Sequence, residues 1–221
     1  MTHMKWPTVA EMEEMVPAPQ DYSLELLHRK DILTVIELIK SWHPSVSVGA
    51  SAPYTREAFY LKEVSLRGEP ETDILVCIIK KGDEVIGMAA NARDQDALTI
   101  QNRLTVISPA HRKGGVFHWL FQLLEPVGRA MGCEYSYAMV TLHYPPVQML
   151  CEQFGYKLAG IVPGFDRELV APGVIKRVYE ALYAKPLVAE TDMLFPDKKQ
   201  LLPQVAALLD QLYPAAAKQQ S

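Results

Sequence analysis

The chain has 221 residues, of which 49% are hydrophobic and 22% charged, an ordinary composition for a globular protein. Its length fits one domain with extensions and is enough to bury a core without disulfides or a metal. With 22 Lys and Arg against 26 Asp and Glu, the formal net charge is −4. This balance argues against a generally basic nucleic-acid-binding protein, so we expect no nucleic-acid partner.

The cysteines are few, and no two of them have CxxC spacing, which argues against a disulfide scaffold and a zinc site. A sparse and odd count is typical of a reducing compartment, so we expect a cytoplasmic protein without a bound metal. Residues 1–19 contain acidic side chains and no apolar run, unlike a signal peptide. The longest uncharged run, 135–151, holds a histidine and two prolines, and we expect no membrane span.

The first part of the chain predicts an arm, a strand and two helices. Residues 1–20 carry three prolines and predict a loose arm with one short helix. YSLELLH (22–28) reads as a strand, and a helix with apolar residues at helical spacing follows it until Pro44. A second helix is predicted over 55–66, where a glycine and a proline break the pattern.

A three-stranded antiparallel meander is predicted next, because apolar β-branched runs alternate with polar turns. Its strands span 73–81, 85–92 and 97–108. Gly114 and Gly115 then open a helix that runs to about Met131, and Pro126 should kink or shorten it.

The second half alternates strands and helices. The predicted elements are a strand over 134–144, a helix over 146–154, a strand over 156–162, a loop over 162–175, a strand over 175–187 and a helix over 197–213 that Pro203 interrupts. A strand–helix–strand unit after a meander predicts a mixed, mostly antiparallel sheet of about six or seven strands flanked by helices, an α/β (α+β) fold. We divide the chain into an arm (1–20), a central domain (21–187) and a C-terminal helical extension (188–221).

The most informative segment is LTVISPAHRKGGVFHWLFQLL (104–124), which reads as a strand, a basic glycine loop and the first turns of a helix. The N–H groups of such a loop form a concave anion site, and the helix N-terminus adds partial positive charge. Arg112 and Lys113 add full charges, while Gly114 and Gly115 let a phosphate approach the backbone. The spacing is neither that of a Walker loop nor that of a Rossmann loop. The segment predicts a pyrophosphate site, and its plainer reading is a basic turn that caps a helix.

A motif within this segment resembles the acyl-CoA-binding motif of the GNAT superfamily of N-acyltransferases. Its pattern V-x-x-P-x-x-R-x-x-G is carried by Val106, Pro109, Arg112 and Gly115. Phe117 stands where the family's usual form ends in glycine or alanine. MLCEQFGYKLAG (149–160) resembles the family's closing helix-to-strand segment, and the order of elements from 22 to 187 also fits the family's fold.

The resemblance implies that the donor is acetyl-CoA or another acyl-CoA, bound where strands 97–108 and 134–144 splay apart. The backbone of three residues would pair with the pantetheine and polarise the thioester carbonyl, namely Thr105, Val106 and Ile107. The loop would hold the pyrophosphate through Arg112, Lys113, Gly114, Gly115, Val116 and Phe117. A β-bulge near 104–106 would aim this backbone.

Two positions depart from the family's pattern. Many members place a tyrosine, the general acid toward the CoA sulfur, where this chain has Cys151, and an asparagine where it has Tyr144. We name both residues as catalytic candidates. For Cys151 two alternatives stay open, that CoA leaves without an acid and that the thiol is a small buried group on a short helix.

A base is needed as well, because an amine acceptor arrives largely protonated. His143 is the best-placed candidate, since imidazole titrates near neutrality, and its plainer reading is a hydrogen-bonded histidine at a strand end. Gln101 and Asn102 are candidates only for orienting a water or the substrate. The loop 162–175 is either a reader of a charged acceptor or simply solvated, and its charged residues are Asp166, Arg167 and Glu168.

Three functions follow from these features. The first is a CoA-dependent N-acyltransferase, acetyl being the expected group, acting on a small-molecule or peptide amine. The second is a non-catalytic acyl-CoA-binding module or sensor, which the altered tyrosine position keeps open. The third is a thiol enzyme that pairs Cys151 with His143. Three arrangements of the C-terminal helix stay open: it packs on the sheet, it covers the acceptor site, or it buries its apolar face in a partner subunit, so a homodimer is one expected arrangement.

Overall fold

The computed structural model describes residues 4–213. The chain divides into two compact units between Leu187 and Val188. Residues 1–3 of the predicted arm and 214–221 of the predicted extension lie outside the described residues.

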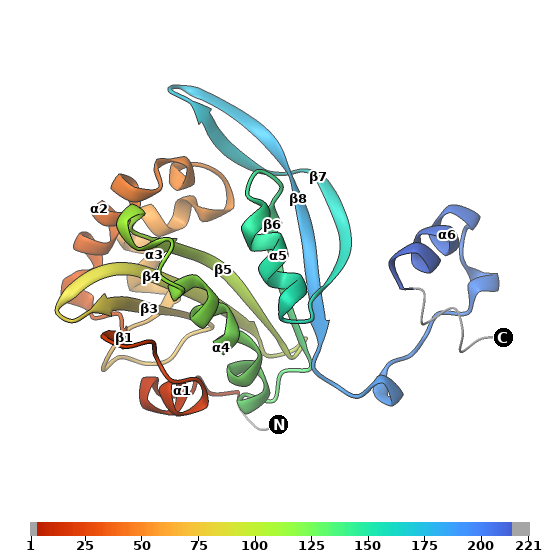
Figure 1. Cartoon of the computed structure of the whole chain (residues 1–221), viewed down its shortest axis with the longest axis horizontal. Helices are drawn as coiled ribbons and strands as arrows, with labels where there is room; N and C mark the ends of the chain where they lie inside the picture. The colour runs from red at the N-terminus through yellow and green to blue at the C-terminus, as the bar shows by residue number, and fades with distance from the viewer. Residues whose placement is uncertain (1–3, 214–221) are drawn as a thin grey trace. The chain divides into compact units, whose positions relative to one another are not determined.

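The first unit is built on an eight-stranded sheet (Figure 1). Seven strands follow the order β1-β3-β4-β5-β6-β8-β7, and β2 pairs with β3. Along that order all neighbours are antiparallel except β5 and β6, so the sheet is mixed and mostly antiparallel, as predicted. The strands are β1 Tyr22–Leu26, β2 Val64–Ser65, β3 Ile74–Lys81, β4 Glu84–Asp94, β5 Thr99–Ile107, β6 Tyr135–Thr141, β7 Lys157–Ala171 and β8 Val174–Pro186.

Helices cover both faces of this sheet. They are α1 Val9–Met15, α2 Ile32–Trp42, α3 Glu57–Glu63, α4 Val116–Ala130 and α5 Pro145–Gln153. Apolar residues of α1, α4 and α5 pack on one face with Ile107 of β5, while those of α2 and α3 pack on the other face with Val106. Successive strand residues point to opposite faces, so β5 contributes alternately to the two cores.

The N-terminal arm is folded against the domain, which corrects the prediction that it is loose. Thr8 begins α1 with a capping box to Glu11. Trp6 is buried and donates its indole N–H to the Thr72 carbonyl at 3.0 Å. Trp119 of α4 donates in turn to the Val16 carbonyl at 3.1 Å. The prolines of the arm suggested a coil. Burial of the arm's apolar side chains outweighs this local preference, so the prediction of a loose arm was wrong.

Two helices differ from their predicted form. Of the helix predicted over 55–66, only α3 (Glu57–Glu63) is helical; a 3₁₀ helix, Gly49–Thr55, ends where the prediction began, and Val64–Ser65 form β2. α4 continues past Pro126 to Ala130, so the proline does not end it. Leu123, Leu124 and Val127 are buried around this position, and their packing compensates for the hydrogen bond that proline cannot donate.

The segment 162–175 is not a loop. β7 and β8 continue through it as a long antiparallel hairpin, which extends beyond the rest of the sheet in Figure 1. Register shifts between Val162 and Asp166 absorb the Pro-Gly pair that suggested a loop. β6 is shorter than predicted and ends at Thr141.

The second unit contains α6, Pro203–Leu212. Pro203 is the first residue of this helix and does not interrupt it, because proline at the first position lacks only an N–H that would have no partner in the helix. None of the residues of α6 is buried.

Candidate functional site

β5 and β6 run in parallel for a short distance and then separate. Their pairing extends from Thr99 with Tyr135 to Asn102 with Ala138. In the described chain no pairing joins Arg103–Ile107 of β5 to Met139–Thr141 of β6. We call these two unpaired stretches the β5–β6 splay.

A β-bulge marks the point where the splay begins. Asn91 of β4 pairs with Asn102, and Ala90 pairs with Leu104, so Arg103 is the extra residue. A bulge bends its strand and increases the local twist, which turns β5 away from β6. The bulge lies one residue before the predicted range 104–106.

The backbone of β5 offers unpaired groups to the splay. The Ser108 N–H donates to the Ile86 carbonyl of β4 at 2.8 Å. In an antiparallel ladder only alternate residues direct their backbone groups at the partner strand. Counting back from Ser108, Val106 faces β4, whereas Thr105 and Ile107 face the splay. The structure therefore places two of the three predicted pantetheine-binding residues at the splay, and the backbone of Val106 belongs to the sheet.

The glycine loop leads from the end of β5 to the start of α4. Gly115 is the N-cap of α4 and has φ +75°, a conformation that favours glycine. A Cβ atom added at Gly115 would meet no described atom within 4 Å. Among the described residues, the N–H groups of Gly115, Val116 and Phe117 have no backbone acceptor. Free donors, open space and a helix N-terminus together form a site suited to a phosphate.

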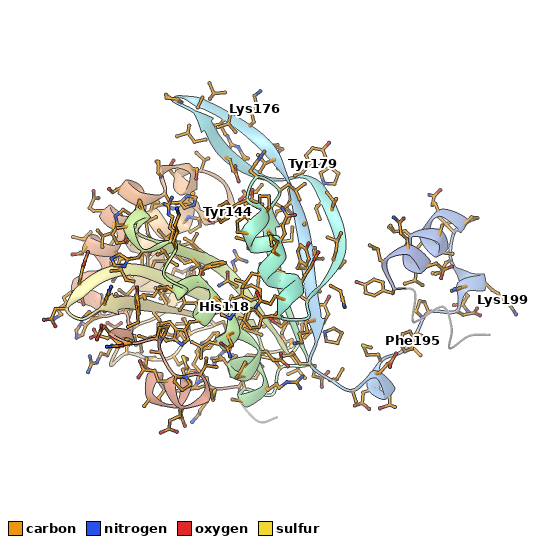
Figure 2. All side chains as sticks on the ribbon, viewed as in Figure 1. His118, Tyr144, Lys176, Tyr179, Phe195 and Lys199 are labelled. Carbon is orange, nitrogen blue, oxygen red and sulfur yellow. The ribbon has the colours of Figure 1, made fainter. Side chains whose placement is uncertain are left out.

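The two cations of the loop differ in their contacts. Arg112 donates to the Ile107 carbonyl at 3.2 Å and to the Trp42 carbonyl at 2.8 Å. Its guanidinium thus ties the loop to the ends of β5 and α2 while leaving its charge beside the loop. Lys113 is exposed. His118, labelled in Figure 2, is exposed on the first turn of α4, and its ring lies 4.8 Å from that of Phe154.

Cys151 is fully buried in α5. Burial raises the pKa of its thiol to about 12. The thiol packs in the core shared by α4 and α5, and it is neither exposed nor activated. This geometry favours the packing alternative, and a catalytic role for Cys151 stays a prediction.

His143 and Tyr144 follow β6 and do not belong to it. His143 is exposed in the turn after Thr141, where its N–H donates to the Thr141 hydroxyl at 3.3 Å. Tyr144 is exposed at the N-cap position of α5 (Figure 2). Both lie at the splay end of β6, and their catalytic roles stay predictions.

Glu180 of β8, which is only 9% exposed, is a candidate site residue that was not predicted from the sequence. It pairs across the sheet with Thr141 of β6 and Val162 of β7. Burial first, and then the carboxylates of Asp166 and Glu168, raise the pKa of Glu180 to about 7.

The sequence did carry a signal for Glu180. Strand alternation places its side chain on the face that also carries Val178 and Leu182. A lone carboxylate between two apolar residues on one strand face is unusual. Perturbed carboxyl groups of this kind are frequent at active sites.

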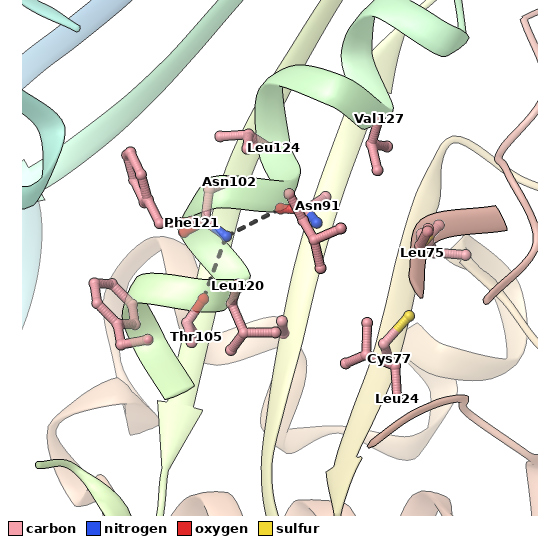
Figure 3. Close-up of a pocket in the computed structure, with 14 residues that line it drawn as sticks. Leu24, Leu75, Cys77, Asn91, Asn102, Thr105, Leu120, Phe121, Leu124 and Val127 are labelled. Atoms are coloured by element: carbon pink, nitrogen blue, oxygen red, sulfur yellow. Dashed lines mark hydrogen bonds between the residues drawn. The ribbon is translucent and has the colours of Figure 1, made fainter. Parts of the chain in front are cut away.

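A small cavity of about 30 Å³ lies between α4 and the sheet (Figure 3). Its polar lining is a network in which Asn102 donates to the Asn91 side-chain oxygen at 3.0 Å and to the Thr105 hydroxyl at 3.3 Å. The volume suits about one water molecule. Asn102 therefore lies on the α4 face of the sheet, while Gln101 accepts a hydrogen bond from Arg103 at 3.1 Å.

Over the described range 4–213, no helix has both the length and the apolar character needed to cross a bilayer. Within the same residues, no group of three or more His, Cys, Asp or Glu side chains is arranged to hold a metal ion. Cys77, Cys133 and Cys151 are buried free thiols.

Comparison with solved structures finds the same fold in several acetyltransferases. A variant of spermidine N-acetyltransferase SpeG from Vibrio cholerae has a TM-score of 0.60 at 15% identity, covering 76% of this chain and 95% of that one. yncA of Salmonella typhimurium, solved with its cofactor acetyl-CoA, has a TM-score of 0.56 at 16% identity, covering 81% and 99%. The IAA acetyltransferase of Bacillus cereus has a TM-score of 0.53 at 12% identity, covering 75% and 99%.

Comparison of sequences is decisive at the level of the family. No curated protein sequence matches the chain. The acetyltransferase (GNAT) family model matches residues 34–156, a range that contains β5, the splay and the glycine loop. Because this range is more than half of the chain, the protein belongs to the GNAT acetyltransferase family and is an acyltransferase enzyme of the GNAT type.

Proposed function

We propose that this enzyme transfers the acetyl group of acetyl-CoA to an amine of a small molecule or peptide. The observation that carries the proposal is the combination of the β5–β6 splay with the open glycine loop at the end of the same strand. The splay would bind an extended amide-containing chain through its backbone groups, and the glycine loop would bind an anion. Pantetheine and pyrophosphate have these properties and are joined in this order in CoA.

The pyrophosphate would lie on the loop 112–117. There the N–H groups of Gly115, Val116 and Phe117 would donate to phosphate oxygens, and the α4 N-terminus would add its partial positive charge. Arg112 and Lys113 would contribute positive charge. The Arg112 guanidinium already donates to two carbonyls, so it need not contact the phosphate directly.

The pantetheine and thioester would lie along β5. Arg112 occupies the Ile107 carbonyl, so the free groups are the Ile107 N–H and both backbone groups of Thr105. An N–H of this pair would donate to the thioester carbonyl and stabilise the negative charge that develops there when the amine attacks. Catalysis would therefore come mainly from positioning and from this polarisation.

An amine as the acceptor is supported by similarity. The neighbours of known fold include a spermidine N-acetyltransferase and an acetyltransferase of ribosomal protein L7/L12, so this fold accepts both small-molecule and peptide amines. The buried free thiols agree with a reducing cytoplasm as the location that we propose. One of the neighbours is dodecameric, and a homo-oligomer of this protein remains part of the proposal.

A second function is favoured by one specific observation. Cys151 occupies the position of the family's usual acid and is buried, with a pKa raised to about 12. If departure of CoA required that acid, the protein would bind acyl-CoA without turnover and would act as a sensor or subunit.

One experiment separates the two functions. Calorimetry with CoA measures binding, and release of free CoA thiol from acetyl-CoA is followed over a library of primary amines, diamines, amino acids and peptides. Binding with amine-dependent thiol release, and an acetylated product of the expected mass, would support the acetyltransferase. Binding without turnover would support the sensor, and absence of CoA binding would contradict both.

A further inference from the structure

Glu180 lies on the face of the sheet opposite α4 and α5. Its neighbours along the strand at odd positions, Ala181 and Tyr183, are buried in the core of α4 and α5. Side chains alternate along a strand, so Glu180 points to the other face, the one that also carries Val106 of β5.

This position is adjacent to the splay. Glu180 pairs with Thr141, one of the residues of β6 that no longer pair with β5. Neighbouring strands lie about 4.8 Å apart, so the Glu180 backbone is one strand spacing from the splay. An acceptor that approaches a thioester in the splay from this face would pass beside the carboxyl group.

Charged groups around Glu180 come from several elements. Asp166 and Glu168 of β7 project on the same face, and Asp166 accepts hydrogen bonds from the N–H groups of Ala50 and Arg167, both at 2.7 Å. Lys176 pairs with Glu168 at the outer end of the hairpin. His43 lies near Glu168, and burial lowers its pKa. The charged groups that raise the pKa of Glu180, Asp166 and Glu168, are both negative, and this environment attracts a cation.

The Glu180 carboxyl group has no partner of its own. Among residues 4–213, no hydrogen bond or ion pair engages it, although the residue is only 9% exposed. The carboxyl oxygens are not among the fully enclosed atoms without a partner, so a ligand that enters from solvent can reach them and supply the missing donor. An ammonium group supplies both the donors and the charge that this position lacks.

We propose that Glu180 is the catalytic residue that accepts the proton of the acceptor's ammonium group. This inference rests on the proposed acetyltransferase function and deepens it. It also assigns the base to β8, outside the range that matches the family, in place of the candidate His143.

The Glu180 carboxylate takes one proton from R–NH₃⁺ and becomes a carboxylic acid. The nitrogen lone pair forms a bond to the thioester carbon, and the tetrahedral intermediate collapses as the C–S bond breaks with its electron pair moving to sulfur. The second nitrogen proton goes to the thiolate, giving the amide and CoA thiol, and Glu180 returns its proton to water.

The test compares Glu180→Gln with the parent enzyme at saturating acetyl-CoA. The acceptors are n-butylamine, 1,4-diaminobutane and the best amine of the library, and kcat/KM is measured from pH 6 to pH 10. Glu84→Gln, an exposed glutamate at the start of β4, is the matched control. Glu180→Asp and His143→Ala complete the set, and calorimetry with CoA confirms that each variant binds the donor.

We expect Glu180→Gln to bind CoA like the parent and to lose about 10² to 10⁴ in kcat/KM near pH 7. A primary amine has a pKa of about 10, so the deficit should shrink tenfold for each pH unit up to that value as free amine replaces the missing base. Glu180→Asp should recover part of the rate. A purely structural role would give no such convergence of the two pH profiles.

Three results would overturn the proposal in distinguishable ways. A parent enzyme that binds CoA but acetylates no amine would contradict the proposed function and the base together. An active parent whose Glu180→Gln variant keeps its rate and pH profile would contradict the base alone. Loss of the rate in His143→Ala with Glu180→Gln unaffected would assign the base to His143.

Discussion

Glu180 of β8 and Thr141 of β6 are directly paired across the sheet at the point where β6 has ceased to pair with β5. The pairing connects two features that lie far apart in the sequence, the splay and the long β7–β8 hairpin. It places a buried carboxyl group with a pKa raised to about 7 one strand from the expected thioester. A group held in this state costs stability at neutral pH, and this cost can be measured without any substrate.

Glu180→Gln should therefore be more stable than the parent at alkaline pH. In the folded parent, the pKa of Glu180 is raised from 4.5 to about 7. The stability that the protonated carboxyl group contributes is therefore fully present below pH 4.5 and is lost as the pH rises through 7. Glutamine mimics the protonated form at all pH values. The free energy of unfolding of the variant should exceed the parent's by ~1–3 kcal/mol at pH 8, and the difference should vanish near pH 4. Urea unfolding at both pH values measures it, and an equal difference at both would contradict burial as the cause.

His143→Ala should reduce kcat/KM by less than about fivefold with its pH profile unchanged, if Glu180 is the base. His143 is exposed in a turn beyond the end of β6, and over residues 4–213 its ring takes part in no hydrogen bond or ion pair. His28→Ala, a change at an exposed histidine that precedes α2, serves as the control. A loss of 10² or more in His143→Ala, with Glu180→Gln unaffected, would restore the sequence-based assignment of the base.

The sequence predicted best those parts of the fold that local patterns determine. β3, β4 and β5 follow from alternating apolar runs and turn residues, and α4 follows from its helical spacing and from Gly115. The glycine loop was recognisable for the same reason, because a nest of N–H groups is built from consecutive residues.

Other features depend on partners that are distant in the sequence. Pro163 and Pro172 suggest a loop, yet β7 and β8 extend through this segment because each strand supplies the other's hydrogen bonds. The role proposed for Glu180 depends on its pairing with Thr141. It also depends on the carboxylates of Asp166 and Glu168, whose positions in β7 follow a register shift. Neither relationship is visible before the strand order is known.

The buried hydroxyl pair of Ser136 and Tyr156 should behave as a coupled unit. Their oxygens lie 2.6 Å apart, and both side chains are fully buried. Ser136→Ala or Tyr156→Phe leaves one hydroxyl without a partner and should lower the free energy of unfolding by ~1–3 kcal/mol. The double variant removes both polar groups and should cost less than the sum of the two. Strictly additive losses in a double-mutant cycle would show that the two groups do not interact.

Removal of residues 188–221 should leave CoA binding intact and change the association state or solubility of the protein. Leu187 must be kept, because it is buried, donates its N–H to the Glu134 carbonyl at 2.7 Å and accepts from Arg129 at 2.6 Å. α6 carries apolar residues at helical spacing and has none buried, so we expect it to associate with another surface. Sedimentation and thermal melting of the 1–187 fragment measure this, and unchanged values for both would show that the extension is dispensable.

Gly115→Glu should weaken CoA binding selectively, and Gly132→Glu provides a matched control at the other end of α4. Gly115 has φ +75° and Gly132 has φ +80°, and a Cβ atom at either position meets no described atom within 4 Å. Both substitutions force a side chain into the left-handed region, so each should lower the free energy of unfolding by about 1–2 kcal/mol. Only the side chain at Gly115 enters the space proposed for the pyrophosphate, and its carboxylate repels the phosphate charge. Calorimetry should therefore show CoA affinity reduced at least tenfold, about 1.4 kcal/mol, in Gly115→Glu and unchanged in Gly132→Glu. Equal affinities in the two variants would remove the loop from the CoA site, whatever their stabilities.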